Sequence, residues 1–378
     1  MIRILKLSFY YEEYIDYFYS SHDLTNLNYE KHQKKIFEDR FGWSDSFKEV
    51  LNDKDSFAVE EIIVNDFFLQ NKWCDENNKS YILNNWQFEI LKEQIKFYKP
   101  NIIFVNNPAI ENKYYELFNL FNVKIISYDG IRAHNKNILK YSNLIVTCLK
   151  SSYNFYKKFN KQVYYMPHGF DLRILKNINK NYEYKYDSVF IGNIKNKHHS
   201  KRIDLLNKMI SKTNLQIWIG DAHKRISKKK LIKKFSLSNY LSGIHYFKNY
   251  FKIKKIINKN LGSIFGIEMY QLISESRIIL NNHINISKNE MANIRLFEAT
   301  GLGTCLLTDH KSNIAEFFDL DEIVTYKDNN EAVEKLKYLI DNPDVAKKIG
   351  KKGMLKTLSK HTIQLRWENF SNYLIKVI

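Results

Sequence analysis

Glycine, proline and cysteine are scarce in this chain, and their scarcity excludes several classes of protein. The 378 residues include 12 glycines, 4 prolines and 3 cysteines. Collagen-like chains and Pro/Gly-rich disordered chains need far more glycine or proline. Cys74, Cys148 and Cys305 are odd in number and far apart, so they form neither a disulfide framework nor a zinc-type spacing. We expect buried thiols in a reducing compartment.

Long apolar runs are also absent from the sequence. No run approaches the roughly 18 apolar residues that a membrane-spanning helix needs. Glu12, Glu13 and Asp16 interrupt any apolar region that a signal peptide would have near the N-terminus. We therefore expect a cytoplasmic protein, with peripheral contact at the inner face of the cell membrane left open.

Acidic residues are the minority charge, with 41 Asp and Glu against 59 Lys and Arg, or a net charge of +18. Such a surplus suggests an anionic partner, namely a nucleotide, phospholipid head groups or nucleic acid. A general drift toward lysine in a chain rich in Lys, Asn and Ile is the competing explanation. The stretches Lys224–Lys234 and Lys248–Lys259 interleave lysine with apolar residues. They fit either a membrane patch or a solvated helix face.

Short apolar runs alternate with amphipathic stretches along the whole chain, and the length predicts about two domains. The runs are rich in Ile and Val without strict alternation, which is typical of parallel strands covered on both faces. We predict strands at Ile2–Leu7, Ile102–Val105, Val123–Ser127, Leu144–Thr147, Val163–Met166, Ser188–Ile191, Leu215–Ile219, Ile278–Asn281, Cys305–Thr308 and Ile323–Thr325, and helices at Trp86–Tyr98, Lys201–Ser211, Met269–Glu275 and Asn330–Ile340. The alternation predicts the α/β class, with two layers of parallel sheet.

Composition shifts suggest where the domains begin and end. A polar, Asn/Lys-rich segment at residues 171–186 would link an N-terminal domain, residues 1–170, to a C-terminal domain, residues 187–360. Residues 361–378 would form a final helix.

The most informative stretch runs from Glu290 to Asp309. It contains a loop carboxylate, Glu290, and a short helix that carries Glu298 and ends near Gly301. A carboxylate early in a helix can accept hydrogen bonds from two ribose hydroxyls, and a helix N-terminus favours an anion such as a diphosphate. Arg295 offers a fork that binds phosphate oxygens. Plain alternatives remain open: a dipole-stabilising Glu298, a loop carboxylate at Glu290 and an ion pair for Arg295.

A second candidate phosphate element follows the strand near residue 190. Gly192 and Asn193 form a turn that leads into a basic loop and a helix opening near Ser200. Backbone N–H groups and cations converge on an anion in such an arrangement. We expect Gly192 and Arg202 to contact the phosphates, with Lys201 as the alternative cation.

The stretch from Glu290 resembles the glycosyl transferases group 1 family of GT-B enzymes, whose motif is Glu, seven residues, Glu, a helix of small residues and a glycine. It is especially similar to the spore-maturation-protein-like branch of that family. The form Asn-x-Arg-x-Phe-Glu-Ala-x-x-x-Gly matches Asn293, Arg295, Phe297, Glu298, Ala299 and Gly303. Met291-Ala292-Asn293 stands where the common form has Gly-Phe-Gly. The likeness is specific in residues 262–318 and extends loosely over most of the chain.

The resemblance implies two Rossmann-like domains with parallel sheets facing across a cleft. The C-terminal domain would bind a nucleotide-sugar donor, the N-terminal domain would bind the acceptor, and the last helix would cross back to the N-terminal domain. Similar enzymes place the region of Glu268 near the nucleotide base and a glycine turn such as Gly192 against the diphosphate. Asn282 ends a predicted strand on the side where ligands bind in open α/β sheets.

Glu290 is a candidate for catalysis, either through the hydroxyls of the donor sugar or by stabilising positive charge at the anomeric carbon. Two residues after strands of the first half are further candidates. Asp129 is placed to act as general base toward the acceptor hydroxyl, although an Asx turn at Asp-Gly explains it too. His168 either contacts the donor sugar or belongs to a turn. The aromatic residues crowded near the N-terminus, such as Tyr10 and Tyr11, fit either a core stripe or a stacking surface for acceptor sugars.

Together these features predict a glycosyltransferase that moves a sugar from a nucleotide-sugar to a glycan, lipid-linked or protein acceptor in surface polysaccharide or lipopolysaccharide synthesis. The Glu–x7–Glu spacing suggests retention of configuration. We expect neither metal nor other cofactor, because Asp319-Leu-Asp321 fits a solvated turn better than a metal-binding Asp-x-Asp. The alternative is a non-catalytic GT-B-like protein that binds nucleotide or glycan. Nucleic acid is not expected as a partner, since the carboxylates of the Glu290–Glu298 run would repel it.

Overall fold

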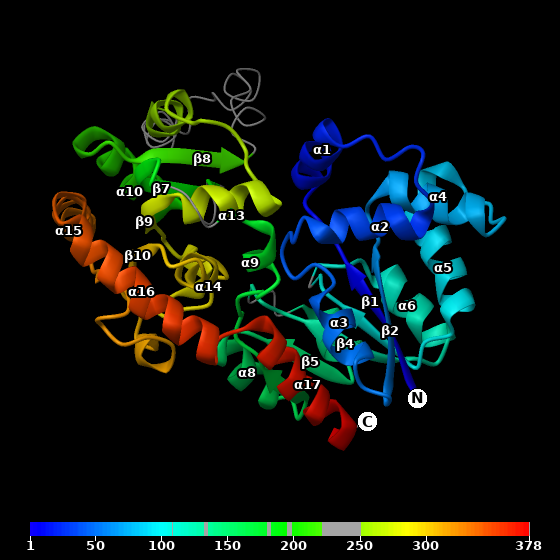
Figure 1. Ribbon diagram of the computed structural model, residues 1–378. Helices are drawn as coiled ribbons and strands as arrows, with labels where there is room; N and C mark the ends of the chain where they lie inside the picture. Colours follow the sequence, from blue (N-terminus) through cyan, green and yellow to red (C-terminus); the bar gives the residue numbers. More distant parts are fainter. Residues whose placement is uncertain (108, 132–134, 180–182, 195–198, 221–250, 378) are drawn as a thin grey trace, which may run out of the picture. The chain divides into compact units, whose positions relative to one another are not determined.

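The computed structural model describes residues 1–107, 109–131, 135–179, 183–194, 199–220 and 251–377, which Figure 1 shows as a ribbon. The chain divides into two compact units. Unit 1 comprises Met1–Lys176 together with Lys360–Ile378, and unit 2 comprises Asn177–Ser359. The chain therefore leaves unit 1 once and returns to it for its last helix.

Unit 1 is built on a six-stranded parallel sheet with the order β2-β1-β3-β4-β5-β6. The strands are β1 (Ile2–Ser8), β2 (Phe57–Ile63), β3 (Ile102–Val105), β4 (Lys124–Tyr128), β5 (Leu144–Thr147) and β6 (Gln162–Tyr165). The strand order reverses at β1, which lies between β2 and β3. In open sheets of this kind the crevice at such a reversal is the usual place for a ligand.

The helices of unit 1 connect the strands, as expected for parallel pairing. They are α1 (Glu12–Ser21), α2 (Tyr29–Glu38), α3 (Ser46–Asn52), α4 (Phe67–Glu76), α5 (Trp86–Tyr98), α6 (Asn112–Leu120), α7 (Lys136–Tyr141), α8 (Lys150–Lys157) and α17 (Ile363–Val377), with a short turn of 3₁₀ helix at Leu83–Asn85 and a short helix α9 (Ile174–Asn177) at the border of the units. The last helix, α17, packs on α3, where Trp367 Nε1 donates to Ser46 Oγ at 2.9 Å.

Strand β2 is the element that the apolar pattern does not predict. Its sequence, Phe-Ala-Val-Glu-Glu-Ile-Ile, contains two consecutive glutamates. Glu61 is nevertheless fully buried, and Lys6 Nζ on the neighbouring strand β1 lies 2.6 Å from its Oε2. A buried ion pair thus replaces an apolar contact. Because the strand lacks a continuous apolar run, the apolar pattern does not predict it. Every strand that the sequence did predict overlaps an observed strand.

Unit 2 is built on a five-stranded parallel sheet with the order β11-β10-β9-β7-β8. The strands are β7 (Tyr186–Asn193), β8 (Gln216–Gly220), β9 (Ser276–Leu280), β10 (Cys305–Asp309) and β11 (Val324–Tyr326). The strand order reverses between β7 and β9, so these two strands flank the crevice expected to receive a ligand.

The helices of unit 2 are α10 (Ser200–Lys212), α13 (Gly266–Ser274), α14 (Arg295–Gly301), α15 (Asn329–Asp341) and α16 (Pro343–Lys360), with 3₁₀ turns at Asn285–Ser287 and Ile314–Glu316 and a helix over residues 251–258. Leu205 of α10 and Leu336 of α15 belong to one apolar cluster with Ile217, Ile278 and Leu307 of the strands. That cluster fixes the sheet whose strand ends carry the polar residues described below.

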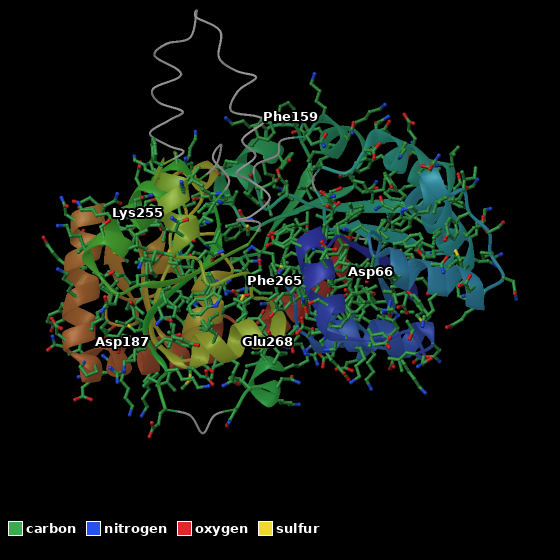
Figure 2. All side chains as sticks on the ribbon, turned by 90° about the horizontal axis from the view of Figure 1, so that it is seen from above. Asp66, Phe159, Asp187, Lys255, Phe265 and Glu268 are labelled. Carbon is green, nitrogen blue, oxygen red and sulfur yellow. The ribbon has the colours of Figure 1, made fainter. Side chains whose placement is uncertain are left out.

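One of the two basic stretches, Lys248–Lys259, lies mostly within the described residues. Ile253 and Ile256 of the helix at 251–258 are buried, whereas Lys254 and Lys255 are exposed; Figure 2 labels Lys255. In this part of Lys248–Lys259 the isoleucines therefore pack inward and the lysines lie on the outer face of the helix. Lys224–Lys234 lies outside the described residues. Within the described part of the chain, no helix is both long and apolar enough to cross a membrane.

Candidate functional site

Polar side chains gather in unit 2 where β7, β9 and β10 reach their carboxyl ends. Gly192 and Asn193 end β7, Asn282 and His283 follow β9, and Asp309 ends β10. Because parallel strands point the same way, these residues meet at one edge of the sheet. The edge includes the point where the strand order reverses, which is the usual ligand position in such sheets.

Arg202 is the central cation of this edge. It lies in the first turn of α10 and is 6% exposed. Its Nη1 donates to the Asn193 carbonyl oxygen at 2.7 Å and its Nη2 donates to the Asn282 carbonyl oxygen, while Nε has no hydrogen-bond partner among the described residues. Burial lowers the pKa of Arg202 to about 10, although the charge of Asp309 opposes this. No carboxylate of the described chain lies within ion-pair distance of Arg202, so the guanidinium is a buried charge without an anion.

Gly192 packs against the Phe190 ring and lies beside this guanidinium. A Cβ at Gly192 would lie 3.1 Å from the Phe190 ring and 3.6 Å from Arg202 Nη1. The guanidinium carbon also lies 5.6 Å from the centre of the Phe190 ring, within the range of a cation–π contact. The glycine, the ring and the arginine therefore form one packed unit at the end of β7.

Glu298 and Arg295 lie side by side at the start of α14. Glu298 is 4% exposed, and its Oε1 accepts from the Tyr270 hydroxyl at 3.1 Å. Its Oε2 lies 2.8 Å from Arg295 Nη1, and the same guanidinium contacts Met269 Sδ at 3.2 Å. The ion pair that the sequence left open for Arg295 is present, and it orients the carboxylate of Glu298.

A chain of amides fastens the loop before α14 to the strand ends. Asn293 Nδ2 donates to Asn281 Oδ1 at 2.9 Å, and Asn281 Nδ2 donates to Thr308 Oγ1 at 2.9 Å. Asn293 Oδ1 in turn accepts from the Arg295 backbone N–H at 2.8 Å. The loop is thereby held against β9 and β10. Through the consecutive residues Asn281 and Asn282, the pair Arg295–Glu298 is connected to the surroundings of Arg202.

Sequence reasoning missed Asp309 as a site residue. Its Oδ1 accepts from the His283 backbone N–H at 2.9 Å and lies 2.7 Å from His283 Nδ1, and its Oδ2 lies 2.9 Å from Lys311 Nζ. Burial alone would raise the pKa of Asp309, but the hydrogen bond from His283 and the charges nearby hold that pKa below its ordinary value. The sequence signal that could have found Asp309 is its position as the last residue of a buried strand in an open sheet.

Tyr326 is a second residue that the sequence did not indicate. Its hydroxyl donates to the Asn281 carbonyl oxygen at 2.8 Å and accepts from Asn282 Nδ2 at 3.2 Å. It closes the edge on the β11 side. Nothing in the sequence separates this tyrosine from the many others in the chain.

Several buried polar atoms at this edge have no hydrogen-bond partner among the described residues. They are Asn193 Oδ1, Arg202 Nε, Asn282 Oδ1, His283 Nε2 and Asn285 Oδ1. Buried polar atoms are normally paired, and each exception needs an explanation. Donors and acceptors of both kinds converge here from β7, α10 and β9, which is the arrangement of a polar ligand site.

The remaining predicted residues of unit 2 lie around this centre in different environments. Lys201 is exposed on α10, so Arg202 is the cation that the fold directs into the site. Glu268, labelled in Figure 2, is exposed in the first turn of α13. Glu290 is half-buried in its loop, where its N–H donates to the Ser287 carbonyl oxygen at 3.0 Å. Gly301 is buried at the end of α14.

In unit 1, Asp129 is held by its own surroundings. Its side chain is fully buried, with Oδ2 accepting from the Tyr156 hydroxyl at 2.6 Å and Oδ1 accepting from the Ile131 N–H at 3.2 Å. The second contact is the Asx turn considered for this Asp-Gly pair.

His168 also makes its contacts within unit 1. Trp43 Nε1 donates to its Nδ1 at 3.3 Å, and its Nε2 lies 3.2 Å from the Tyr128 hydroxyl. Burial, assisted by the charge of Arg366, lowers the pKa of His168 to about 4. The ring is therefore neutral near pH 7, with Nδ1 as acceptor and Nε2 as donor.

The N-terminal aromatic residues divide into two groups. Tyr14 and Phe18 are buried in the core on α1, and Tyr14 stacks on Phe41 with 3.8 Å between ring centroids. Tyr10 and Tyr11 follow β1 and lie 5.2 and 5.7 Å from the same Phe41 ring, with Tyr11 exposed. The core interpretation therefore applies to Tyr14 and Phe18, whereas Tyr11 lies at the surface.

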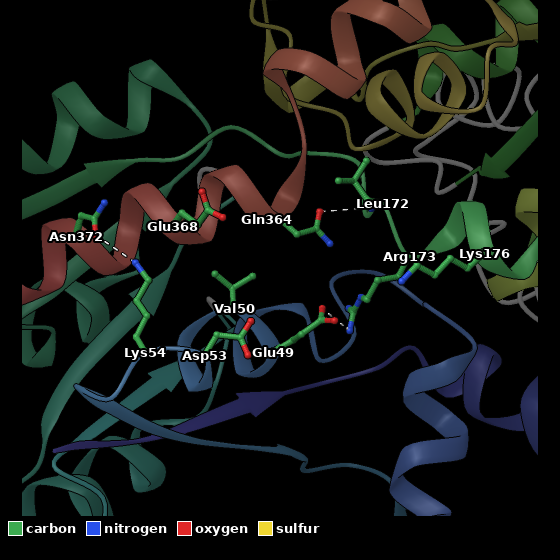
Figure 3. A pocket seen from close by; sticks show the side chains of 10 residues that line it. All are labelled: Glu49, Val50, Asp53, Lys54, Leu172, Arg173, Lys176, Gln364, Glu368 and Asn372. Carbon is green, nitrogen blue, oxygen red and sulfur yellow. Dashed lines mark hydrogen bonds and ion pairs between the residues drawn. The ribbon is translucent and has the colours of Figure 1, made fainter.

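A separate pocket of about 570 Å³ lies in unit 1 between α3, α17 and the segment before α9 (Figure 3). Its arginine is already paired, since Arg173 lies 2.7 Å from Asp45, 2.9 Å from Glu49 and 2.7 Å from Asp171. None of the residues that line it has a buried polar atom without a partner. The chemistry of a ligand site is therefore concentrated at the strand ends of unit 2 and not in this pocket.

The candidate metal motif lies in an ion-paired turn. Asp319 lies 3.4 Å from Lys356 Nζ, and Asp321 pairs with Lys352, both lysines being on α16. Within the described residues, no group of His, Cys, Asp or Glu has the arrangement of a metal site.

Comparison with known protein families gives a match for part of the chain. Residues 228–372 match the model of a family described as glycosyl transferase-like. No curated protein sequence matches the chain.

Solved structures share the fold over the full length of the chain. A glycosyltransferase from Rickettsia africae ESF-5 is 13% identical with a TM-score of 0.59 and covers 100% of this chain and 98% of its own. Anabaena HepE in complex with UDP-glucose is 9% identical with a TM-score of 0.59 and covers 100% of both chains. A putative UDP-N-acetylglucosamine 2-epimerase from Listeria monocytogenes is 8% identical with a TM-score of 0.52, covering 98% of this chain and 94% of its own. The predicted fold class, α/β of the GT-B type with two parallel sheets, is confirmed.

Proposed function

We propose that this chain is a glycosyltransferase that takes a sugar from a nucleotide-sugar donor bound at the strand ends of unit 2. The observation that carries the proposal is the buried guanidinium of Arg202, which contacts two carbonyl oxygens and no described carboxylate. A buried charge without a counter-ion is strongly unfavourable. A diphosphate supplies the missing negative charge and can accept a hydrogen bond from the unpartnered Nε.

The chemistry of the other residues at this edge suggests which part of the donor each of them contacts. Glu298, oriented by Tyr270 and Arg295, accepts hydrogen bonds from the ribose hydroxyls. Gly192 and Asn193 bring backbone close to the phosphates. Glu290 contacts the transferred sugar. The exposed Glu268, in the first turn of α13, lies near the nucleotide base. The motif from Asn293 to Gly303 supports membership in the spore-maturation-protein-like branch.

The acceptor belongs to unit 1 in this proposal. The exposed ring of Tyr11 follows β1, where the strand order of that sheet reverses, and it rests against Phe41. Aromatic faces suit the apolar sides of sugar rings, which supports a glycan, lipid-linked or protein-linked acceptor in surface glycoconjugate synthesis, with contact at the membrane during transfer. Since Asp129 and His168 are bonded inside unit 1, we propose that both position the loops that carry them.

The reaction needs cations to stabilise the leaving diphosphate, and Arg202 supplies one without a metal ion. The Glu–x7–Glu spacing supports retention of the anomeric configuration. The putative epimerase from Listeria has a similar fold, so epimerisation of the donor sugar is the competing reaction. Analysis of the products formed from a donor and a candidate acceptor distinguishes transfer from epimerisation. A non-catalytic binding protein would leave the donor unchanged.

The ribose assignment of Glu298 is tested by comparing nucleoside diphosphates with their 2′-deoxy forms. The native protein is expected to bind the ribose form about tenfold or more tightly, the range of a hydrogen bond to a charged group. Glu298→Ala should remove this preference, whereas Glu334→Gln, at an exposed position of α15, should keep it. Equal affinity of the native protein for both forms would remove the assignment.

A further inference from the structure

One ring nitrogen of His283, Nε2, has no role yet in the proposed donor site. The side chain is 1% exposed, and its Nδ1 lies 2.7 Å from Asp309 Oδ1. Its Nε2 is buried and has no hydrogen-bond partner among the described residues. Because a carboxylate only accepts hydrogen bonds, Nδ1 must carry a proton. Nε2 is therefore the atom that His283 presents to anything outside its own fold.

The charges around His283 favour an anion at Nε2. Asp309 faces it from β10, and Lys311 pairs with the second oxygen of that carboxylate at 2.9 Å. Arg202 of α10 donates to the carbonyl oxygen of Asn282, the residue just before His283. From β11, the hydroxyl of Tyr326 accepts from the Asn282 side chain.

These groups have a simple charge balance among the described residues. Arg202 and Lys311 are positive and Asp309 is negative, so the group is singly positive with a neutral imidazole. The two anionic phosphates of a nucleotide-sugar therefore meet an excess of positive charge at this edge. Arg295 and Glu298 neutralise each other at 2.8 Å and leave this balance unchanged.

We propose that His283 binds the diphosphate of the donor through Nε2–H, with Asp309 as the positioning residue that fixes the ring and stabilises the imidazolium. The inference rests on the proposed donor site and adds a second phosphate ligand beside Arg202. An imidazolium held by a carboxylate makes a charge-assisted hydrogen bond, and it retains this bond as negative charge develops on the leaving diphosphate.

The matched variants are His283→Asn and His283→Gln. The Asn amide can donate to Asp309 in place of Nδ1–H but has no atom at the position of Nε2, whereas the Gln amide reaches further. Calorimetric titration would use ADP, GDP and UDP together with adenosine, guanosine and uridine. For the nucleotide that the native protein binds, His283→Asn should weaken diphosphate binding about 10- to 100-fold and leave nucleoside binding unchanged. His283→Gln should restore part of the lost affinity. His310→Asn, at the exposed position next to Asp309, should change neither diphosphate binding nor nucleoside binding.

The charge of Asp309 gives a second readout. Asp309→Asn still accepts from Nδ1–H but carries no negative charge. Relative to the native protein, this variant should bind the nucleoside diphosphate more weakly and the nucleoside equally well.

The outcomes separate the inference from the proposed function. Parallel loss of nucleoside and diphosphate binding in His283→Asn, or no loss at all, overturns the role of His283 and leaves the donor site in place. A loss confined to the nucleoside assigns Nε2 to a sugar hydroxyl and also overturns it. A native protein that binds none of these compounds overturns both.

Discussion

At the scale of single residues, the sequence indicates the chemistry of the candidate site better than its geometry. Arg202 and Lys201 are equivalent in the sequence, and only the rotation of α10 decides that Arg202 is buried and Lys201 exposed. Glu298 lies in the first turn of its helix, as predicted, because the Glu–x7–Glu spacing is local. The pairing of His283 with Asp309 joins residues on two strands, and no spacing rule predicts it.

The neutral state of His168 makes stability depend on pH in a defined direction. Its pKa is lowered from 6.5 to about 4 in the folded protein, so between these values the unfolded chain binds more protons. The free energy of unfolding should therefore fall as the pH drops from 6.5 toward 4, by up to about 3 kcal/mol from this residue. Urea unfolding of the native protein and of His168→Gln across this range measures the effect.

The difference between the two pH curves isolates His168. His32, whose pKa is also lowered to about 4, is present in both proteins and cancels. The native protein should lose more stability on acidification than the variant. Parallel curves would show that His168 becomes charged freely in the folded state.

At the scale of elements, the parallel strands with continuous apolar sequence were predictable, and β2 was not. Pattern recognition relies on apolar residues, whereas β2 uses a buried ion pair with β1. The shortness of α14 was predictable from Gly301 and Gly303, but the amide chain from Asn293 to Thr308 was not, because it joins three separate elements.

The buried pair of Lys6 and Glu61 should be sensitive to the loss of one partner. Both side chains are fully buried, and Glu61 Oε1 also accepts from the Lys48 N–H at 3.0 Å. Lys6→Met leaves an uncompensated buried carboxylate and should destabilise the protein by about 3–5 kcal/mol. Lys6→Met combined with Glu61→Gln removes both charges, keeps the acceptor for Lys48, and should recover most of the loss. Denaturant unfolding measures both, and equal stability of the two variants would contradict the assignment.

Helix α16 depends on a close approach to the turn at Gly303, between α14 and β10. A Cβ at Gly350 would lie 2.2 Å from the Gly303 carbonyl oxygen and 3.1 Å from the Cys305 nitrogen. Gly350→Ala should therefore lower the free energy of unfolding by about 1–3 kcal/mol, although alanine is intrinsically the better helix former. Lys351→Ala, at the exposed next position, should be close to neutral. A stabilised Gly350→Ala variant would show that α16 has room to move.

At the scale of the whole molecule, the fold class follows from strand–helix alternation, whereas the division into units depends on contacts between distant segments. The return of the chain to unit 1 is fixed by the bridge between Phe170 and Thr362 and by Trp367 packing on α3. Such pairings between segments hundreds of residues apart leave no local pattern. The proposed donor site lies in unit 2, whose strand order brings Gly192, Arg202 and Asn282 to one edge.

The most direct test of the donor site is calorimetric titration of Arg202→Met and Lys201→Met with a panel of nucleoside diphosphates and nucleotide-sugars. Since Met replaces a buried charge that lacks a described anion, Arg202→Met should fold at least as stably as the native protein. It should bind the preferred nucleotide about 10- to 100-fold more weakly, whereas Lys201→Met should bind within about twofold of the native protein. Native affinity in Arg202→Met, equal losses in both variants, or no saturable binding of any nucleotide by the native protein would contradict the account.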